Sequence, residues 1–221
     1  MPGKNIRPLL GKPLLAYTIG AARESGVANV VAVSTDCQET AEVALSYGAE
    51  VVPRPTEIAG DSASTEAALI HALNWYSERG FPAEHVLTLQ PTSPLRGAAQ
   101  IRGLVESYFS SARQVDCLLS MNERREDFWL VEQGRTWRRL FPDAPRRSQD
   151  RSPLYEENSA IYLTRVRALR DTGSILGNSA AGYLISREEA VDINDELDLL
   201  WAEFLLTKQR KLAHTDAAPG D

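Results

Sequence analysis

Residues 85–96, HVLTLQPTSPLR, constrain the fold of this chain more than any other stretch. The short apolar run Val86–Leu89 changes abruptly at Gln90 into the loop Pro91–Pro94. A short apolar run between turn signals predicts a strand buried on both faces, and such strands belong to parallel sheets covered by helices. Ligands bind beyond the carboxyl ends of these strands. We therefore expect Gln90 to face a ligand and Arg96 to supply positive charge at the rim; the alternative is a stiff proline loop without a ligand.

Strands and helices alternate along most of the chain, which predicts an α/β fold with a doubly wound, mostly parallel sheet. The expected strands are 29–34, 50–52, 86–89, 115–120, 159–164 and 182–185. The expected helices are 13–26, 39–47, 64–79, 98–110 and 196–206, with Ser64 as an N-cap. A length of 221 residues suits one domain. We assign residues 1–212 to that domain and expect a disordered tail at 213–221.

Residues 122–153 break the alternation. They are polar and rich in arginine, with Trp129 and Trp137 as the main apolar side chains, and Glu132–Gly134 fits the turn of a hairpin. A long stretch outside the core pattern is usually a lid, an arm or a partner surface. Exposed aromatic residues flanked by arginines favour an oligomer interface. The alternative is an excursion that packs on its own domain.

Composition narrows the classes of function. The net charge of −6 argues against a protein that coats nucleic acid, although a local cluster of Lys and Arg could still hold a small anion. Two cysteines, Cys37 and Cys117, are too few for a disulfide framework or a zinc site. No apolar run is long enough to span a bilayer, and no signal peptide is apparent, so we expect a cytoplasmic protein without membrane contacts.

Four polar loops lie at strand ends or helix starts, where a doubly wound sheet can bring them together: 2–5, 53–65, 90–96 and 191–195. They carry four basic side chains, Lys4, Arg7, Arg54 and Arg96. The amides near Ser64 could bind an anion, and Asp192 with Asn194 offers the oxygen ligands that Mg²⁺ prefers. A phosphate-rich ligand bound with a divalent ion would explain both the basic side chains and the oxygen ligands. Considered alone, Lys4 could equally be an exposed surface lysine. Asp192 alone could be an acidic residue that stabilises the start of a helix. No Walker or Rossmann glycine motif is present.

Together these loops resemble the acylneuraminate cytidylyltransferases, enzymes that make CMP-activated sialic acids and related nine-carbon acidic sugars. The matching motifs are PGKN at 2–5, STD at 34–36, RPTEIAGDSAST at 54–65, LQPTSPLR at 89–96, ENSAIYL at 157–163 and VDINDELD at 191–198. The resemblance implies a nucleotide-diphospho-sugar transferase-like fold and a homodimer. It also implies that 122–153 is a protruding dimerisation arm that lends residues to the neighbouring subunit's sugar site.

The resemblance further implies CTP and a nonulosonic acid as substrates, Mg²⁺ as cofactor, and Lys4, Gln90 and Asp192 as catalytic residues. Lys4 and Asn5 would contact the CTP phosphates and nucleotide, and Gln90 would reach both substrates. The implied cytidine and ribose contacts are Arg54, Ala63 and Thr65, the implied sugar-side contacts are Asn158 and Tyr162, and Arg96 and Arg147 complete the substrate-binding set. Asp192, with Asn194 beside it, would bind Mg²⁺.

Three departures from the family pattern qualify this expectation. The family begins with a buried strand and an ARxGSKG-like phosphate loop, whereas this sequence starts at PGKN. Asn194 replaces the second acid of the usual IDID motif, so Mg²⁺ should bind more weakly. The family's sugar-binding arginine corresponds to Ser148, with Arg147 one place earlier. Two alternatives therefore stay open: a non-catalytic relative that binds nucleotide or a partner, or a coding start that lies upstream. The particular nonulosonic acid also stays open.

Overall fold

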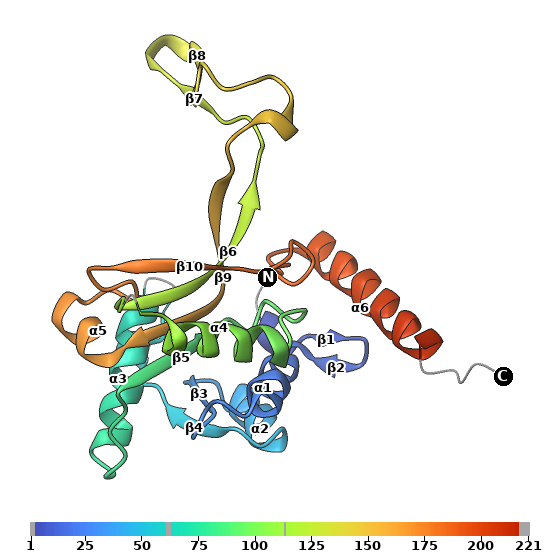
Figure 1. Cartoon of the computed structure of the whole chain (residues 1–221). Coiled ribbons are helices and arrows are strands. Elements are labelled where there is room, and N and C mark those ends of the chain that lie inside the picture. Colours follow the sequence, from blue (N-terminus) through green and yellow to red (C-terminus); the bar gives the residue numbers. More distant parts are fainter. Residues whose placement is uncertain (1–2, 61–62, 113, 217–221) are drawn as a thin grey trace.

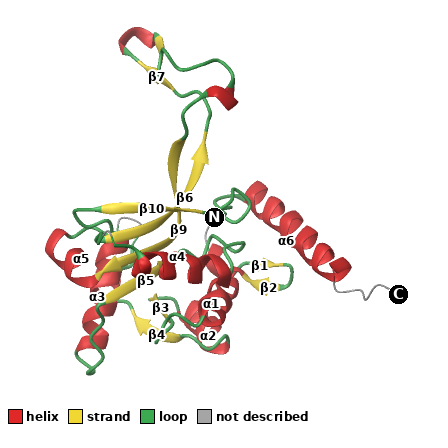
Figure 2. Ribbon diagram, viewed as in Figure 1, coloured by secondary structure: helices red, strands yellow, loops and turns green. Residues whose placement is uncertain are grey.

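The computed structural model describes residues 3–60, 63–112 and 114–216 (Figure 1). Its α-helices are α1 (Leu14–Ser25), α2 (Gln38–Ser46), α3 (Thr65–Ser77), α4 (Ala98–Ser110), α5 (Val166–Thr172) and α6 (Glu196–Asp216). Its strands are β1 (Pro8–Leu9), β2 (Lys12–Pro13), β3 (Ala32–Thr35), β4 (Glu50–Pro53), β5 (His85–Leu89), β6 (Cys117–Arg124), β7 (Trp129–Val131), β8 (Trp137–Arg139), β9 (Leu154–Arg165) and β10 (Ala180–Leu184). Figure 2 shows the helices around the central strands.

The central sheet has the strand order β10-β6-β9-β5. Strands β10 and β6 are parallel, and β9 is antiparallel to both β6 and β5. Three of the four strands therefore run in one direction, and β5 lies at one edge. Strands β3 and β4 form a separate parallel pair. The expected α/β fold with a mainly parallel sheet is confirmed, with β9 as its one reversed strand.

Alternate side chains of the central strands enter cores on opposite faces of the sheet, as the two-residue repeat of a strand requires. Leu118 and Ile161 pack with Leu104 of α4 on one face. Cys117 and Tyr162 pack together on the other face. There α3 and α5 form a further cluster around Leu73, Val166 and Leu169, with Val86 of β5 packed against it. Helices cover both faces, which explains why the strands are apolar on both sides.

An arm projects from this body (Figure 1). It begins where β6 and β9 continue past the sheet as a two-stranded stalk, in which residues 121–124 pair with residues 154–157. The β7–β8 hairpin stands above the stalk. The register of the β6–β9 ladder shifts between Leu119 and Met121, and Ser159 has a positive φ of 60° opposite this irregularity. A bulge of this kind bends a strand, and here it marks the point where the ladder leaves the core.

Sequence and structure differ in four places. The helix α5 and the short β1–β2 pair were not expected. Strand β9 is much longer than the expected 159–164, because its first half forms the stalk. Helix α6 continues to Asp216, where the sequence predicted a tail from residue 213; residues 217–221 lie outside the described part. No helix in the described ranges is long and apolar enough to cross a membrane.

Candidate functional site

Three loops that are distant in sequence meet at the carboxyl end of β5. The backbone N–H of Ile193 donates a hydrogen bond to the carbonyl of Thr92 at 2.9 Å. The Lys4 Nζ lies 3.4 Å from both the Ile193 carbonyl and the Asn194 Oδ1. A buried cluster that contains Leu9, Leu95 and Ile193 supports this junction from below. The structure thus joins the PGKN, LQPTSPLR and VDIND motifs.

An open pocket of about 540 Å³ adjoins this junction. Its lining residues come from the stalk, the segment after β10 and the start of α6: Asn122, Arg124, Glu156, Glu157, Asn158, Ser159, Arg187, Glu188, Ala190, Val191, Asp192, Asp198 and Trp201. Two of the expected site residues, Asn158 and Asp192, lie in this wall. We call this cavity the stalk pocket.

Hydrogen bonds fix the Asn158 side chain in the stalk pocket. Its Oδ1 accepts from Ser120 Oγ at 2.6 Å and from the Ala160 N–H at 3.1 Å. Its Nδ2 donates to Asn122 Oδ1 at 3.0 Å, and Asn122 in turn donates to the Ile185 carbonyl. These bonds span the bulge in the β6–β9 ladder. Side chains held in this way present a preorganised polar wall to a ligand.

Tyr162 acts behind the pocket wall. Its ring is almost fully buried, and its hydroxyl donates to the Glu157 carboxylate and contacts Ser159 Oγ at 3.2 Å. Burial, together with the Glu157 hydrogen bond, raises the pKa of Tyr162. The hydroxyl therefore stays protonated and positions Glu157, which lines the pocket. Tyr162 itself is not among the residues that line the stalk pocket, whereas the resemblance implied a place on the sugar side for it.

Arg187 is the least constrained positive charge of the stalk pocket. The other lining cation, Arg124, forms a 2.6 Å ion pair with Glu156, and this bond is the main reason that its pKa is raised. Arg187 approaches only Glu126 in the described chain, at 3.5 Å, and its side chain is 68% exposed. The wall also carries five carboxylates, from Glu156, Glu157, Glu188, Asp192 and Asp198. An anionic ligand would therefore need Arg187 or a cation to enter.

The acidic motif offers one carboxylate to a metal ion. Asp192 lines the pocket, and its Oδ2 accepts from Asn194 Nδ2 at 2.7 Å. The carboxylates of Asp195 and Asp198 accept backbone N–H groups at the start of α6 and serve as its cap. Within the described ranges, no group of three or more His, Cys, Asp or Glu residues is placed to hold a metal. The residues fit Mg²⁺ held by Asp192 plus substrate phosphate oxygens, the arrangement that Mg²⁺ commonly adopts.

The prediction that Arg96 lies at the rim of the site is wrong. Arg96 is only 1% exposed, and its Nη2 donates to Thr18 Oγ1 at 2.9 Å and to the Gln90 carbonyl at 3.3 Å. Its Nε and Nη1 are buried without a hydrogen-bond partner among the described residues. Burial lowers the pKa of Arg96 to about 10. Arg96 thus stabilises the backbone of the 90–96 loop from the protein interior, through its hydrogen bond to the Gln90 carbonyl.

Other predicted residues lie elsewhere. Arg54 bonds to Ser34 at the end of β3, through Nε to Oγ at 3.1 Å and through Nη2 to the carbonyl at 2.6 Å. Ala63 and Thr65 flank Ser64, whose side chain caps α3. In the described part of the chain, these three residues do not line the stalk pocket. Arg147 lies on the arm, outside the pocket lining. Asn5 adjoins Lys4 in a short 3₁₀ turn.

Sequence reasoning missed Asn122, Arg187 and Trp201. Asn122 ends the apolar run of β6, and Arg187 follows β10. Both residues follow apolar strand segments, so the tendency of ligands to bind at strand ends is the sequence signal that could have identified them. Trp201 had a weaker signal, because an aromatic residue on an amphipathic helix usually packs in the core.

Comparison with known proteins shows the family of the chain. The sequence profile described as cytidylyltransferase matches residues 1–134. The N-acylneuraminate cytidylyltransferase of Escherichia coli O18:K1:H7 is 32% identical over 94% of this chain, which spans about half (48%) of that relative. The CMP-N,N'-diacetyllegionaminic acid synthase of Legionella pneumophila is 31% identical over 93% of this chain and 90% of its own length. The chain belongs to the cytidylyltransferase family, as the motifs predicted.

A solved structure of CMP:2-keto-3-deoxy-manno-octonic acid synthetase complexed with CTP shares the fold. It superposes with a TM-score of 0.70 over 95% of this chain and 93% of that chain, at 13% sequence identity. At this identity the likeness concerns the fold alone. It confirms the α/β architecture that the alternation of strands and helices predicted.

Proposed function

We propose that this protein transfers CMP from CTP to the anomeric hydroxyl of a sialic-acid-like nine-carbon acidic sugar. The anomeric oxygen forms a bond to the α-phosphorus, and the bond from that phosphorus to the oxygen bridging to the β-phosphate breaks. Pyrophosphate leaves with the electron pair of that bond, and the hydroxyl proton is released to solvent. Such a reaction depends on charge neutralisation and in-line positioning more than on a strong nucleophile in the protein.

The junction of the three motifs beside the stalk pocket is the observation that supports this proposal most. Lys4, Thr92 and Ile193 are linked directly, and Asp192 extends from the same segment into the pocket. A phosphate chain at the junction and a sugar in the pocket would place the two reacting groups next to each other. The names of two relatives, N-acylneuraminate cytidylyltransferase and CMP-N,N'-diacetyllegionaminic acid synthase, support a sialic-acid-like sugar as the second substrate.

In this proposal Lys4 neutralises a CTP phosphate and Gln90 lies between the two substrates. Asp192 holds Mg²⁺, which supplies further neutralisation of the phosphates when it is bound. Asn194 connects Asp192 to Lys4, because its Nδ2 donates to Asp192 and its Oδ1 faces the Lys4 ammonium. Asn194 thereby binds the Oδ2 of Asp192 and orients the other carboxylate oxygen.

At the sugar end we propose that Arg187 receives the carboxylate of the substrate. It is a loosely paired cation in a pocket that is otherwise acidic, and an arginine can bind a carboxylate through two parallel hydrogen bonds. The fixed amides of Asn122 and Asn158 would then bind sugar hydroxyl or acyl groups. Tyr162 contributes by holding Glu157 in place.

We also propose a homodimer that works in the cytoplasm, without nucleic-acid or membrane partners. CTP is a cytoplasmic metabolite, and both cysteines, exposed Cys37 and buried Cys117, are free thiols. The net charge of −6 disfavours nucleic acid. The apolar surface of the arm, which carries the exposed Phe128, Trp129 and Trp137, supports self-association.

A pyrophosphate-release assay tests the proposed reaction. Purified protein receives CTP, Mg²⁺ and in turn N-acetylneuraminic, legionaminic and pseudaminic acids, with a neutral hexose as control. We expect release with at least one nine-carbon acid and none with the hexose. No release with any acid would contradict the proposal.

The competing hypothesis is a non-catalytic relative that binds nucleotide. Among the described residues, Nε and Nη1 of Arg96 have no hydrogen-bond partner and one edge of β5 has no neighbouring strand. Both observations support this hypothesis, because they mark an incompletely bonded region beside the junction. Calorimetry separates the two hypotheses. Mg²⁺-dependent CTP binding without turnover supports the non-catalytic relative, whereas binding followed by pyrophosphate release supports the enzyme.

A further inference from the structure

One side of the stalk pocket is apolar. Among the described lining residues, Ala190, Val191 and Trp201 are the apolar ones, and all three belong to the segment that leads from β10 into α6. The side chains that the stalk contributes to the described lining are polar or charged. Ala190 and Val191 also pack against buried clusters of the body, so the apolar side is anchored in the core. The pocket therefore offers a ligand one polar wall and one apolar wall.

Trp201 is the largest side chain of the apolar wall, and it is held in place from two sides. Its neighbour Ala202 is fully buried against the body, which fixes the backbone of α6 at this point. The Trp201 ring stacks on the ring of Phe204 at a centroid distance of 5.4 Å and an interplanar angle of 14°. Trp201 is nevertheless 50% exposed. A fixed, half-exposed aromatic ring at a pocket is suited to bind an apolar group of a ligand.

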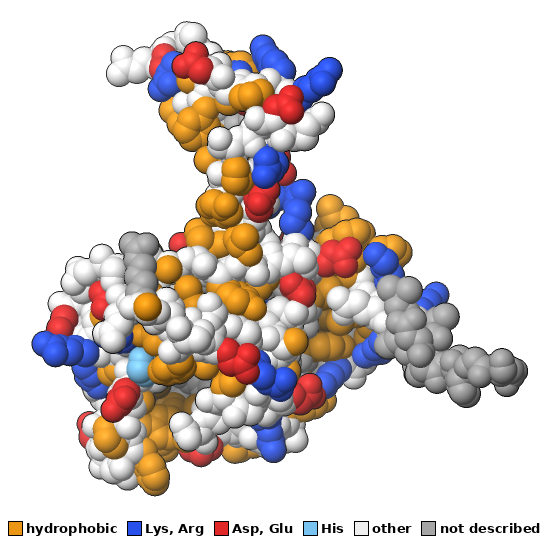
Figure 3. Space-filling view, viewed as in Figure 1, with side chains coloured by type: hydrophobic (Ala, Val, Ile, Leu, Met, Phe, Trp, Pro, Cys, Tyr) orange, Lys and Arg blue, Asp and Glu red, His pale blue; other side chains and the backbone are white. Residues whose placement is uncertain are grey.

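Other exposed apolar side chains of α6 do not take part in the pocket. Leu197 is 73% and Leu200 is 61% exposed, and neither lines it. Figure 3 shows hydrophobic atoms over the start of α6, beside acidic and basic side chains at the base of the stalk. Trp201 differs from the two leucines because it borders a cavity whose polar wall also restricts the ligand.

The polar wall defines the chemical group that the Trp201 ring would meet. The amides of Asn122 and Asn158 are bonded to each other and to the backbone, so their orientation is fixed. Amides can donate to and accept from an acylamino substituent of a sugar. The methyl group of the same substituent is stabilised by burial against an apolar surface. A hydroxyl group in its place would satisfy the amides but leave the apolar wall without a ligand contact.

We infer that Trp201 is a specificity-determining residue that packs against the acyl methyl group of a nine-carbon acidic sugar. The protein accordingly prefers acylated sugar acids to analogues that carry a hydroxyl group at the same carbon. This inference rests on the proposed function and narrows its substrate class. Recognition of one small apolar group in a pocket changes kcat/KM by about tenfold or more, because the burial of that group stabilises the transition state.

A comparison of substrates tests the inference. Pyrophosphate release is measured with N-acetylneuraminic, legionaminic or pseudaminic acid, whichever reacts fastest, and with its analogue in which a hydroxyl replaces each acylamino group. We expect a kcat/KM about tenfold higher for the acylated acid. Trp201→Ala should lower kcat/KM about tenfold for the acylated acid and less than twofold for the analogue.

Leu197→Ala is the matched control, because it changes an exposed apolar residue of the same helix outside the pocket lining. It should leave both values of kcat/KM unchanged. Equal losses for the two acids in Trp201→Ala, or no loss for either, would overturn the inference and leave the proposed reaction standing.

Tryptophan fluorescence gives a readout that does not depend on turnover. We expect at least one of the three acids, added together with CMP, to change the emission of the unaltered protein. Trp201→Phe should abolish this change, while Trp75→Phe in α3 should keep it, and circular dichroism confirms that both variants are folded. A change that persists in Trp201→Phe, or no change in the unaltered protein, would refute the Trp201 contact. Absence of pyrophosphate release concerns the proposed reaction, which the earlier assay tests separately.

Discussion

At the scale of single residues, the site depends on a chain of polar contacts that joins the start of the sequence to its last motif. Lys4 contacts Asn194, and Asn194 contacts Asp192. The substitution of asparagine for a second acid therefore has a structural role, because the amide can accept from Lys4 and donate to Asp192 at once. A carboxylate could not donate to Asp192 and would repel it.

Lys4→Ala tests this chain. The Lys4 ammonium lies 3.4 Å from the Ile193 carbonyl and the Asn194 Oδ1, next to Asp192. A charged hydrogen bond to phosphate is worth about 2 kcal/mol, so we expect a roughly 30-fold or larger loss in kcat/KM for CTP. Cys117→Ser is the control. Cys117 is fully buried, and burial raises the pKa of its thiol to about 11, so this change should lower the thermal midpoint without altering kcat/KM. Equal losses of kcat/KM in both variants would refute the assignment.

Arg187→Ala tests the sugar end of the pocket. Loss of the loosely paired guanidinium should raise KM for the acidic sugar about tenfold or more while KM for CTP stays within twofold, because the charge-assisted contact is lost on the sugar side only. Arg167→Ala removes a 93% exposed arginine of α5 and serves as the matched control. A comparable rise in KM for CTP would place Arg187 at the nucleotide.

At the scale of elements, the sequence predicted the helices well because their signals are local. Ser64 caps α3 through a 3.1 Å bond to the Ala67 N–H, and Gly26 ends α1 in the left-handed conformation. The burial and the position of individual site residues, in contrast, are set by the tertiary fold. The burial of Arg96 and the distance of Arg147 from the pocket follow from packing between segments, which no local pattern encodes. The reversed direction of β9 is likewise set by its pairing with β5 and β6.

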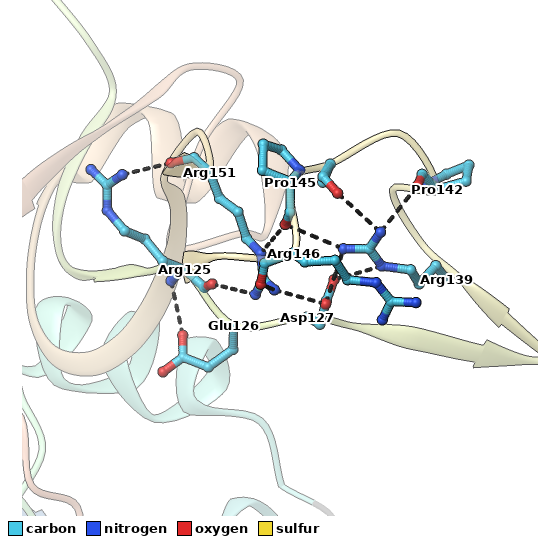
Figure 4. A network of polar contacts seen from close by, with 9 residues as sticks. Arg125, Glu126, Asp127, Arg139, Pro142, Pro145, Arg146 and Arg151 are labelled. Carbon is cyan, nitrogen blue, oxygen red and sulfur yellow. Dashed lines mark hydrogen bonds and ion pairs between the residues drawn. The ribbon is translucent and has the colours of Figure 1, made fainter. Parts of the chain in front are cut away.

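A network of polar contacts around the Asp127 carboxylate stabilises the arm, as Figure 4 shows. Asp127 accepts from Arg139 at 2.7 Å and from Arg151 at 2.9 Å, and all three side chains are largely buried. The two arginines also bond to loop carbonyls, among them that of Pro145. The arm has little apolar core of its own, so this network fixes the hairpin on the stalk.

Asp127→Ala should therefore loosen the arm while the body stays folded. Two guanidinium groups would lose their shared carboxylate at a cost of about 2 kcal/mol, and the arm amides should exchange hydrogen at least tenfold faster. Asp143→Ala changes an exposed carboxylate of the same arm and is the control. Unchanged exchange in the arm of Asp127→Ala would show that other contacts hold it.

At the scale of the whole molecule, the chain combines a covered sheet with two incompletely covered parts, the arm and α6. Both border the stalk pocket, the arm through its stalk and α6 through Trp201. The pocket is consequently open in a single chain, and its acidic wall makes the entry of an acidic sugar depend on Arg187 or on a bound cation. Substrate selection, metal binding and self-association are thus expected to depend on one another.

The most direct test of the central claim is phosphorus NMR of the reaction of the unmodified protein with CTP, Mg²⁺ and a nine-carbon acidic sugar. We predict a new sugar phosphodiester resonance and pyrophosphate in equal amounts, both dependent on the sugar. CTP that stays intact with every acid, or pyrophosphate formed without the phosphodiester, would contradict CMP transfer.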